Sequence, residues 1–471
     1  MKRTVLTLSE QHIGAIKRHF AAQNGREGAG YIFCGFSKVD SDPWNGLPQD
    51  KFFARHFEPV PASAVVSSSS VHITWDTGTF IRALRRCREE AEVAAVIHYH
   101  PGGLERFSEQ DNRNEAELLD LAGKRNGRHT KLLSVVLLPD GRLFGRVWSG
   151  VNEFQPLDLI CVIGRRYALH YPGRGDNQPV AFLNRQALAL GNAINEDLAQ
   201  LRVGIVGCGA TGSAIAMLLP RLGVRYIALF DRDGADETNL NRLHFSSSSD
   251  AAQNRPKVEI IKRGIDAMEL GVCVRPFRGW INDPAGREAL KSCDVLFGCT
   301  DDHVGRLLLN RFAYFYSTPV IDMGLAIKVG DGDPPRVQAF DGRVTVLQPG
   351  TTCLLCRGVI DLQRAFAESL KRSDPAEFER QKAEAYVVGE GNPSPAVVPF
   401  TTSVAAMAVE ELIHRLQGFR GVDGSADQRL RQFHRGADRK PGHRPSEDCP
   451  ICASGEYWGR GDMEPFLDAN L

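Results

Sequence analysis

Hydrophobic and polar positions alternate with two different periods along the first third of the chain. Short runs rich in β-branched and aromatic residues predict strands at residues 30–36, 94–100 and 131–138. Helical patterns lie at residues 77–91 and 108–123, and Ser108 stands where the N-cap of the second helix is expected. Residues 1 to about 150 are therefore predicted to form an α/β domain.

A different order of elements begins after the stretch YPGRGDNQP, whose proline, glycine, asparagine and aspartate residues are typical of a linker. Residues 201–233 predict a strand, a glycine turn, a helix and a strand, and residues 294–302 and 318–325 predict further strands. This βαβ order indicates a parallel sheet in a separate domain.

The predicted organisation has a first domain at residues 1–155, a linker at 156–180 and a second domain at 181–471. A highly charged segment at residues 361–395 predicts a helix followed by a loop. A short tail that carries cysteines occupies residues 441–471.

The composition excludes several function classes. Equal numbers of basic and acidic residues, 57 of each, argue against binding of nucleic acid or a membrane surface through bulk charge. No segment has the apolar length of a secretory signal or a membrane span. We therefore expect a cytoplasmic protein, and those of its 11 cysteines that occur in pairs are expected to be metal ligands before disulfides.

The segment HYHPGGLERFSEQD, residues 98–111, carries the first candidate site. His98 and His100 are two positions apart on a predicted strand, so both side chains leave the same face. Asp111 follows in the first turn of the next predicted helix. Two imidazoles and one carboxylate leave the fourth corner of a Zn²⁺ tetrahedron open, as in a catalytic zinc site, although a lone His-x-His is more often a pair of core or surface histidines. The general base of such a site is expected at Glu27, with Glu92 and Glu105 as alternatives.

This set of residues resembles the JAB/JAMM (MPN) metalloprotease family over roughly the first 150 residues. The resemblance implies zinc ligation by His98, His100 and Asp111, with Glu27 as general acid/base. Ser108 would donate a hydrogen bond to the oxyanion or position the site. Tyr99 stands where the family usually has serine or threonine, and this position is not a ligand. Members of the family cleave peptide or isopeptide bonds at the C-terminus of ubiquitin-like proteins.

The segment GIVGCGATG carries the second candidate site. Gly207, Gly209 and Gly212 allow a tight turn and let backbone N–H groups approach a phosphate at a helix N-terminus. Asp231 ends the next predicted strand, where an acidic residue binds ribose hydroxyls. Taken alone, this fingerprint is typical of NAD binding.

Further charged residues favour an ATP-using adenylating enzyme over an oxidoreductase. Cations that neutralise a triphosphate and a carboxylate that holds Mg²⁺ are expected in such an enzyme. The sequence supplies Asp233, Asn239, Arg242, Lys257 and Asp301.

This second set resembles the ThiF/MoeB/ubiquitin-activating superfamily over roughly residues 180–460, which adenylates the C-terminal glycine of ubiquitin-like proteins and has a Rossmann-like fold. The resemblance implies ribose binding by Asp231, Mg²⁺ binding and catalysis by Asp301, and phosphate binding by Asn239, Arg242 and Lys257. Arg185 would reach the partner's nucleotide across a homodimer. Two positions depart from the family pattern, where Ala210 replaces glycine and Asp302 replaces asparagine.

Two Cys-x-x-Cys pairs about 90 residues apart suit a closed structural zinc site. They are Cys353, Cys356, Cys449 and Cys452, and the superfamily commonly has such a split site. Thioester-forming relatives also carry a nucleophilic cysteine between the two pairs, but residues 357–448 contain none. Cys299 is more readily explained as a packing residue, so no covalent nucleophile is assigned.

The leading hypothesis is a bifunctional enzyme with Zn²⁺, ATP and Mg²⁺ as cofactors. Its metalloprotease would cleave after the C-terminal glycine of a ubiquitin-like protein, and its second domain would adenylate that glycine. A sulfur-transfer hypothesis instead forms a thiocarboxylate, with the protease releasing the carrier. A third hypothesis is a scaffold that only binds a ubiquitin-like protein. A conjugating enzyme or a sulfur donor is the further partner expected.

Overall fold

The computed structural model describes residues 2–150, 153–175, 178, 180–330, 336–383 and 395–463, and these divide into two compact units. Unit 1 is built mainly from Met1–Ser41 and Leu47–Asp176, and it includes a segment that starts at Trp458. Unit 2 is built mainly from Asn177–Tyr457, and it includes the short segment Asp42–Gly46. Each unit is described by itself below.

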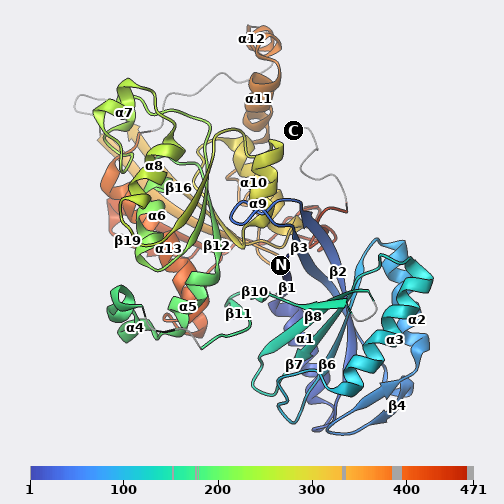
Figure 1. Cartoon of the computed structure of the whole chain (residues 1–471). Coiled ribbons are helices and arrows are strands. Elements are labelled where there is room, and N and C mark those ends of the chain that lie inside the picture. The colour runs from blue at the N-terminus through green and yellow to red at the C-terminus, as the bar shows by residue number, and fades with distance from the viewer. Residues whose placement is uncertain are drawn as a thin grey trace. The chain divides into compact units, whose positions relative to one another are not determined.

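Within the described residues, unit 1 contains a mixed sheet with the strand order β11-β10-β1-β3-β2-β6-β7-β8-β9 (Figure 1). Strands β6 and β7 are parallel, whereas β2 pairs antiparallel with both β3 and β6. The bounds of the nine strands are β1 Arg3–Ser9, β2 Ala29–Val39, β3 Gln49–Pro59, β6 Val93–Tyr99, β7 Leu132–Leu137, β8 Leu143–Gly150, β9 Glu153–Pro156, β10 Leu159–Ile163 and β11 Ala168–His170.

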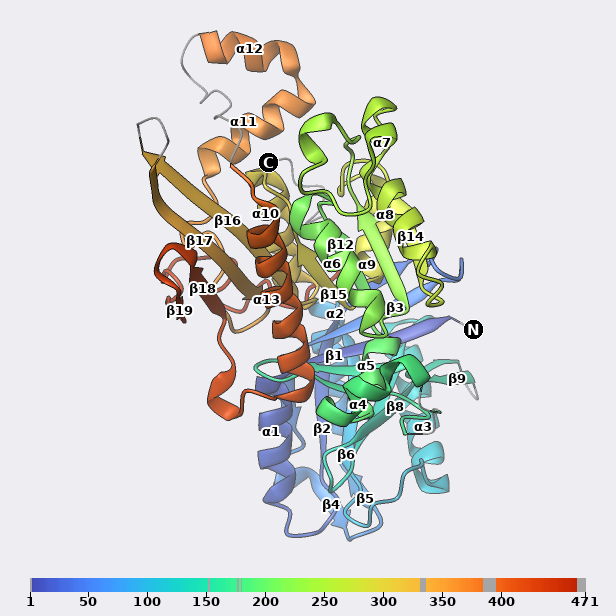
Figure 2. The same cartoon turned by 90° about the vertical axis from the view of Figure 1, so that its left-hand side faces the viewer.

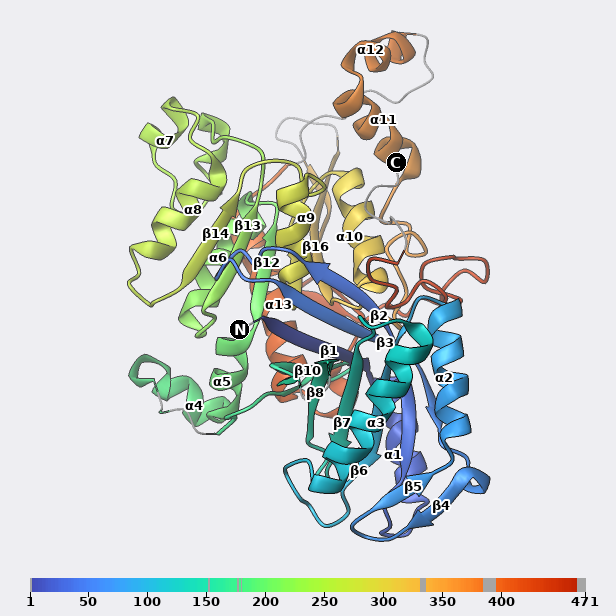
Figure 3. The same cartoon turned by 45° about the vertical axis from the view of Figure 1, so that its right-hand side comes forward.

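Helices cover both faces of this sheet, as Figure 3 shows. Helix α1, Glu10–Ala21, buries Ile16 and Phe20 against one face, where Leu6, Ile32 and Ile97 lie. Helices α2, Thr77–Glu89, and α3, Glu109–Asn126, bury apolar side chains against the other face. A small separate sheet joins β4, Val65–Ser68, to β5, Ile73–Trp75. The predicted α/β class and the predicted N-cap at Ser108 are confirmed.

The predicted linker differs from the observed structure. Within residues 156–180, β10 pairs in parallel with β1, and β11 pairs antiparallel with β10. Both strands are short, and the partner β1 lies at the other end of the domain sequence. Local sequence patterns carry no signal for such a distant pairing, so the first sheet extends further than the expected boundary at residue 155.

Unit 2 contains a second sheet with the order β14-β13-β12-β15-β16-β17-β18-β19 among the residues that the structure describes. The strands from β14 to β16 are parallel, and those from β17 to β19 are antiparallel. Their bounds are β12 Arg202–Val206, β13 Tyr226–Phe230, β14 Cys273–Phe277, β15 Val295–Gly298, β16 Val320–Gly330, β17 Arg336–Leu347, β18 Gln428–Gln432 and β19 Ala437–Arg439. The predicted parallel βαβ arrangement is confirmed.

Helices pack against this sheet, and α13 lies beside α6, β16 and β17 (Figure 2). The helices of unit 2 are α4 Asn184–Leu190, α5 Ala193–Gln200, α6 Ala210–Arg221, α7 Ser248–Ala252, α8 Lys257–Asp266, α9 Pro284–Ser292, α10 His303–Phe315, α11 Leu362–Ser373, α12 Pro375–Ala383 and α13 Val398–Gln417. None of the helices in the described ranges has the length and apolar character needed to span a bilayer.

The charged segment at 361–395 begins with two helices, α11 and α12, where one was predicted. Asp361 caps α11 by accepting hydrogen bonds from the backbone N–H groups of Gln363 and Arg364. The predicted loop at the end of this segment falls on residues 384–394, which lie outside the described residues.

Candidate metal and nucleotide sites

His98, His100 and Asp111 converge in unit 1. The two Nε2 atoms are 2.9 Å apart, and they lie 3.4 and 3.6 Å from the carboxylate oxygens of Asp111. A tetrahedral metal with bonds of about 2.0–2.1 Å separates neighbouring ligand atoms by about 3.3 Å. The three side chains therefore fit a shared zinc ion, and both histidines are buried.

Local structure places these three side chains. His98 lies near the end of β6 and His100 directly follows that strand, while Asp111 lies in the first turn of α3. The Leu104 carbonyl lies 2.8 Å from Nδ1 of His100, which orients that ring with Nε2 toward the cluster. Ser108 and Asp111 form a capping box at the start of α3, and the Ser108 hydroxyl donates to Asp111 at 2.8 Å. Ser108 thus positions the Asp111 carboxylate.

Electrostatics couple these side chains to Glu27. Glu27 is buried, and burial raises the pKa of its carboxyl group, although His98 and His100 act to lower it. Burial opposes the charged form of His100, but Asp111 and the Leu104 carbonyl raise its pKa overall. Burial also opposes the charged form of Asp111, yet hydrogen bonds from both histidines hold its pKa well below the usual range.

The two alternative bases are engaged elsewhere. Glu92 is buried in ion pairs with Arg55 at 2.8 Å and Arg86 at 3.2 Å. Glu105 is exposed and pairs with Arg142. Of the three glutamates considered, Glu27 therefore has the electrostatic connection to the histidine cluster.

A cavity of about 460 Å³ opens at the carboxyl ends of the parallel strands in unit 2. The predicted residues that line it are Gly207, Gly209, Ala210, Asp231, Asp233, Asn239, Arg242, Lys257, Asp301 and Asp302. Gly212 and Arg185 do not line it. Arg185 is exposed on α4, so its predicted role toward a partner's nucleotide stays a prediction.

Gly212 does not line the cavity, but the glycine turn requires a residue without a side chain at this position. A Cβ added at Gly212 would lie 1.9 Å from the carbonyl oxygen of Gly207, so glycine allows α6 to pack against the turn. Gly207 has a φ of +90°, a conformation that favours glycine. Gly209 precedes α6, whose N-terminal N–H groups open toward the cavity.

Acidic and basic side chains lie close together where β13 ends and α8 begins. Asp231 accepts hydrogen bonds from the backbone N–H groups of Cys208 at 2.6 Å and Asp233 at 2.8 Å. Burial raises the pKa of Asp231, and nearby Lys257 opposes that shift. Lys257 Nζ lies 3.3 Å from the Asp233 carboxylate, which places a cation at the cavity wall.

The two aspartates after β15 differ in their contacts. Asp302 is the N-cap of α10, and its carboxylate accepts from the Gly305 N–H and the Thr300 hydroxyl. The family pattern has asparagine at this position, and its side-chain oxygen also caps helices well. The replacement by Asp302 therefore preserves the N-cap of α10. Asp301 lines the cavity, and its backbone carbonyl faces Arg306 Nη1 at 3.5 Å.

Cys299 is half-buried and lines the cavity, and burial raises the pKa of its thiol well above the ordinary value. It contacts the Phe297 carbonyl and the sulfur of Met323. A thiol that stays protonated is a poor nucleophile. These contacts favour the packing interpretation of Cys299.

Several cavity residues were not predicted from the sequence. They are Thr211, Arg232, Trp280, Arg306, Met323, Gly324 and Thr401, among others. Arg306 follows the CTDD segment within one helical turn, and that proximity was the available signal. Thr211 lies within the glycine turn and Arg232 lies between Asp231 and Asp233, whereas Trp280, Met323, Gly324 and Thr401 reach the cavity only through the fold.

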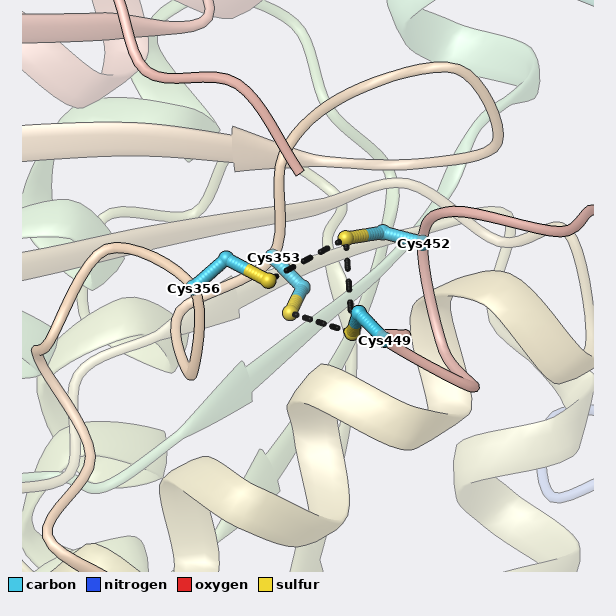
Figure 4. A group of neighbouring side chains, drawn as sticks. All are labelled: Cys353, Cys356, Cys449 and Cys452. Atoms are coloured by element: carbon cyan, nitrogen blue, oxygen red, sulfur yellow. Dashed lines mark hydrogen bonds between the residues drawn. The ribbon is translucent and has the colours of Figure 1, made fainter. Parts of the chain in front are cut away.

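The four cysteines of the two Cys-x-x-Cys pairs gather at one place, as Figure 4 shows. Their sulfurs are 3.8 Å apart for Cys353 and Cys449, 3.7 Å for Cys356 and Cys452, and 3.6 Å for Cys449 and Cys452. A disulfide needs about 2.05 Å, whereas a tetrahedral zinc–thiolate site with bonds of about 2.3 Å separates sulfurs by about 3.8 Å. The spacing fits a closed zinc site, and the Ser446 N–H donates to Cys356 Sγ at 3.3 Å.

A Cys452→Ser variant is expected to lose one zinc ion per chain and to unfold at a lower temperature. The loss of a structural metal costs more than about 4 kcal/mol, which corresponds to a decrease in Tm of about 8 °C or more. Metal analysis and thermal unfolding of the full chain measure both effects. Cys273→Ser, at a partly exposed cysteine outside the cluster, should change neither. Unchanged zinc content in Cys452→Ser would contradict the assignment.

The model of the ThiF family matches residues 183–451, which is more than half of the chain. The chain belongs to the ThiF family. The model described as prokaryotic homologs of the JAB domain matches residues 9–149 of this ThiF-family protein.

Individual relatives match the ThiF-family region. The molybdopterin-synthase adenylyltransferase of Escherichia coli K12 is 29% identical over 199 residues, covering 41% of this chain and 72% of that protein. The ubiquitin-like modifier-activating enzyme 5 of Culex quinquefasciatus is 26% identical over 175 residues, covering 34% of this chain and 41% of that protein. Among solved structures, E. coli MccB with succinimide aligns with a TM-score of 0.44 and 18% identity, covering 60% of this chain and 76% of that one.

Proposed function

We propose that this protein is a bifunctional enzyme that acts on the C-terminal glycine of a ubiquitin-like protein. Unit 2 joins the glycine carboxylate to AMP, with release of pyrophosphate from ATP. Unit 1 hydrolyses the peptide or isopeptide bond that follows the same glycine. Membership of the ThiF family and the matched JAB domain support this combination.

In the adenylation step, different residues of the cavity lining bind different parts of the nucleotide. Asp231 binds the ribose hydroxyls at the end of β13, and the N–H groups at the start of α6 bind phosphate. Asn239, Arg242 and Lys257 orient the triphosphate and stabilise its charge. Asp301 holds Mg²⁺, which when bound neutralises the departing pyrophosphate. Arg185 completes the site of a second copy in a homodimer.

In the hydrolytic step, His98, His100 and Asp111 hold Zn²⁺, which when bound supplies an activated water and a Lewis acid. Glu27 takes the proton from the attacking water and delivers it to the leaving amine. Ser108 holds the Asp111 carboxylate in place through the hydrogen bond of the capping box. Burial raises the pKa of the Glu27 carboxyl group, which favours a role in proton transfer.

The observation that carries the adenylation proposal is the cavity itself, since ten residues predicted from the sequence line it. The full chain is expected to catalyse ATP–pyrophosphate exchange only when a small ubiquitin-like protein with a terminal glycine is added. A panel of such proteins is tested beside matched versions that lack this glycine. Exchange that is equally fast with the truncated versions, or without any protein acceptor, would contradict the proposal.

The sulfur-transfer alternative is favoured by one specific observation. Residues 357–448 contain no cysteine, and the pKa of the half-buried Cys299 is raised, so neither offers a ready thiolate for a thioester. In this alternative, the acyl adenylate reacts with a sulfur donor and yields a thiocarboxylate. Mass spectrometry of the acceptor protein distinguishes a thiocarboxylate from a conjugate.

A further inference from the structure

Three charged side chains form a cluster in unit 2, at the side of the cavity formed by β16. Asp322 is almost fully buried and lies 2.6 Å from Arg343 and 3.5 Å from Arg306. Arg343 also donates to the Thr345 hydroxyl at 2.6 Å. The guanidinium group of Arg343 therefore neutralises the Asp322 carboxylate. The cluster of two arginines and one aspartate keeps an excess positive charge.

The excess charge resides on Arg306, which lines the cavity. Its Nη atoms make only long contacts with backbone carbonyls, at 3.3 Å to Met323 and 3.5 Å to Asp301. Its buried Nε faces the Asp322 carboxylate at 3.5 Å, so this edge of the guanidinium group is turned toward Asp322. The two Nη groups, whose own contacts are long, are left to donate to a ligand in the cavity.

Both guanidinium groups lie close to the cavity wall at Gly324. A Cβ added at Gly324 would lie 3.2 Å from Arg343 Nη2 and 3.4 Å from Arg306 Nη2, which is tight for a Cβ contact. Glycine at this position therefore lets both groups approach the backbone of a residue that itself lines the cavity.

The order of the strands separates this cluster from the ribose end of the cavity. The parallel strands run β13-β12-β15-β16, with Asp231 after β13, Gly207 after β12 and Asp301 after β15. Neighbouring strands lie about 4.8 Å apart, so the β13 and β16 ends are separated by about 14 Å. If the ribose binds at β13 and the phosphates at β12, the β16 end is left for the second substrate.

We propose that Arg306 binds the terminal carboxylate of the acyl substrate and presents it to the nucleotide. This inference rests on the proposed adenylation function. A guanidinium group binds a carboxylate through two parallel hydrogen bonds, which are among the stronger hydrogen bonds in proteins. Asp322 positions the Arg306 side chain through its contact with Nε, and Arg343 in turn positions Asp322. Arg306 thereby selects for a free C-terminus over an amidated or extended one.

The test measures binding, so that it does not depend on turnover. The full chain is loaded with Mg²⁺ and the non-hydrolysable analogue AMPCPP, and its affinity for AMPCPP is recorded first. Acetyl-glycyl-glycine and its C-terminal amide are then titrated by ligand-observed NMR. The acid should bind at least about tenfold more tightly than the amide, and Arg306→Ala should weaken binding of the acid about 10- to 100-fold.

Two further variants sharpen this experiment. Arg306→Lys keeps the charge but loses the planar fork, so it should retain part of the affinity for the acid. Arg128→Ala, at an exposed arginine on unit 1, should change nothing. Affinity for AMPCPP should stay the same in every variant.

Three outcomes would overturn the assignment of Arg306. In the first, the wild-type chain binds the acid and the amide equally or binds neither. In the second, Arg306→Ala binds the acid as tightly as the wild-type chain does, and in the third, that variant loses as much affinity for AMPCPP as for the acid. The comparison of acid with amide on the wild-type chain stands even if a variant fails to fold. Failure of AMPCPP to bind the wild-type chain would instead count against the adenylation function.

Discussion

A His98→Ala variant is expected to lose the peptidase activity of unit 1 and one zinc ion per chain. His98 supplies one of three ligands, and the 2.9 Å contact with His100 shows how closely the ligand atoms converge. Without a bound metal, the attacking water loses several kcal/mol of activation, which corresponds to a decrease of roughly 10³-fold in rate. Cleavage of a ubiquitin-like protein extended beyond its terminal glycine, together with metal analysis, measures both effects.

The matched control for this variant is His129→Ala, an exposed histidine that follows α3. It should retain the zinc content and the activity of the wild-type chain. ATP–pyrophosphate exchange with a mature, glycine-ended acceptor should be the same in both variants, because that reaction belongs to unit 2. Full cleavage by a His98→Ala chain that has lost the zinc would contradict the role given to the cluster.

An Asp301→Ala variant is expected to lose ATP–pyrophosphate exchange by about 10²- to 10³-fold while it keeps the peptidase activity. Asp301 lines the cavity beside the N-terminus of α10, and its carboxylate is the group assigned to Mg²⁺. Loss of this carboxylate leaves the charge that develops on pyrophosphate less well neutralised. The loss should appear mainly in kcat, since the metal acts most strongly on the transition state.

Asp266→Ala, on the exposed side of α8, is the control for this loss and should exchange at the wild-type rate. A rise in Mg²⁺ concentration should partly restore the Asp301→Ala activity, because the defect is in metal binding. Exchange that persists undiminished in Asp301→Ala would rule out this carboxylate as the metal ligand.

The short-range parts of both sites were predictable because their residues are close in sequence. His98 and His100 share a strand face, and the Ser108–Asp111 capping box is a local motif, so a pattern of fourteen residues contains all three candidate metal ligands of unit 1. The glycine turn was predictable for the same reason. The role of Gly212, however, depends on the Gly207 carbonyl 1.9 Å from its missing Cβ, which is visible only in the folded chain.

Long-range pairings account for what the sequence did not predict. Strands β10 and β11 lie inside the expected linker, because β10 finds its partner in β1 at the start of the chain. The Asp322–Arg343 pair forms across the antiparallel strands β16 and β17, and no spacing rule links it to Arg306 on α10. The packing of the fold brings these charges together.

The central claim is that one chain exposes a terminal glycine and then activates it. The most direct test compares ATP–pyrophosphate exchange on a glycine-ended ubiquitin-like protein and on the same protein extended by one residue. The wild-type chain should use both forms, whereas His98→Ala should use only the mature form. Equal exchange on the extended form by the wild-type and His98→Ala chains, or exchange on neither form, would contradict the account.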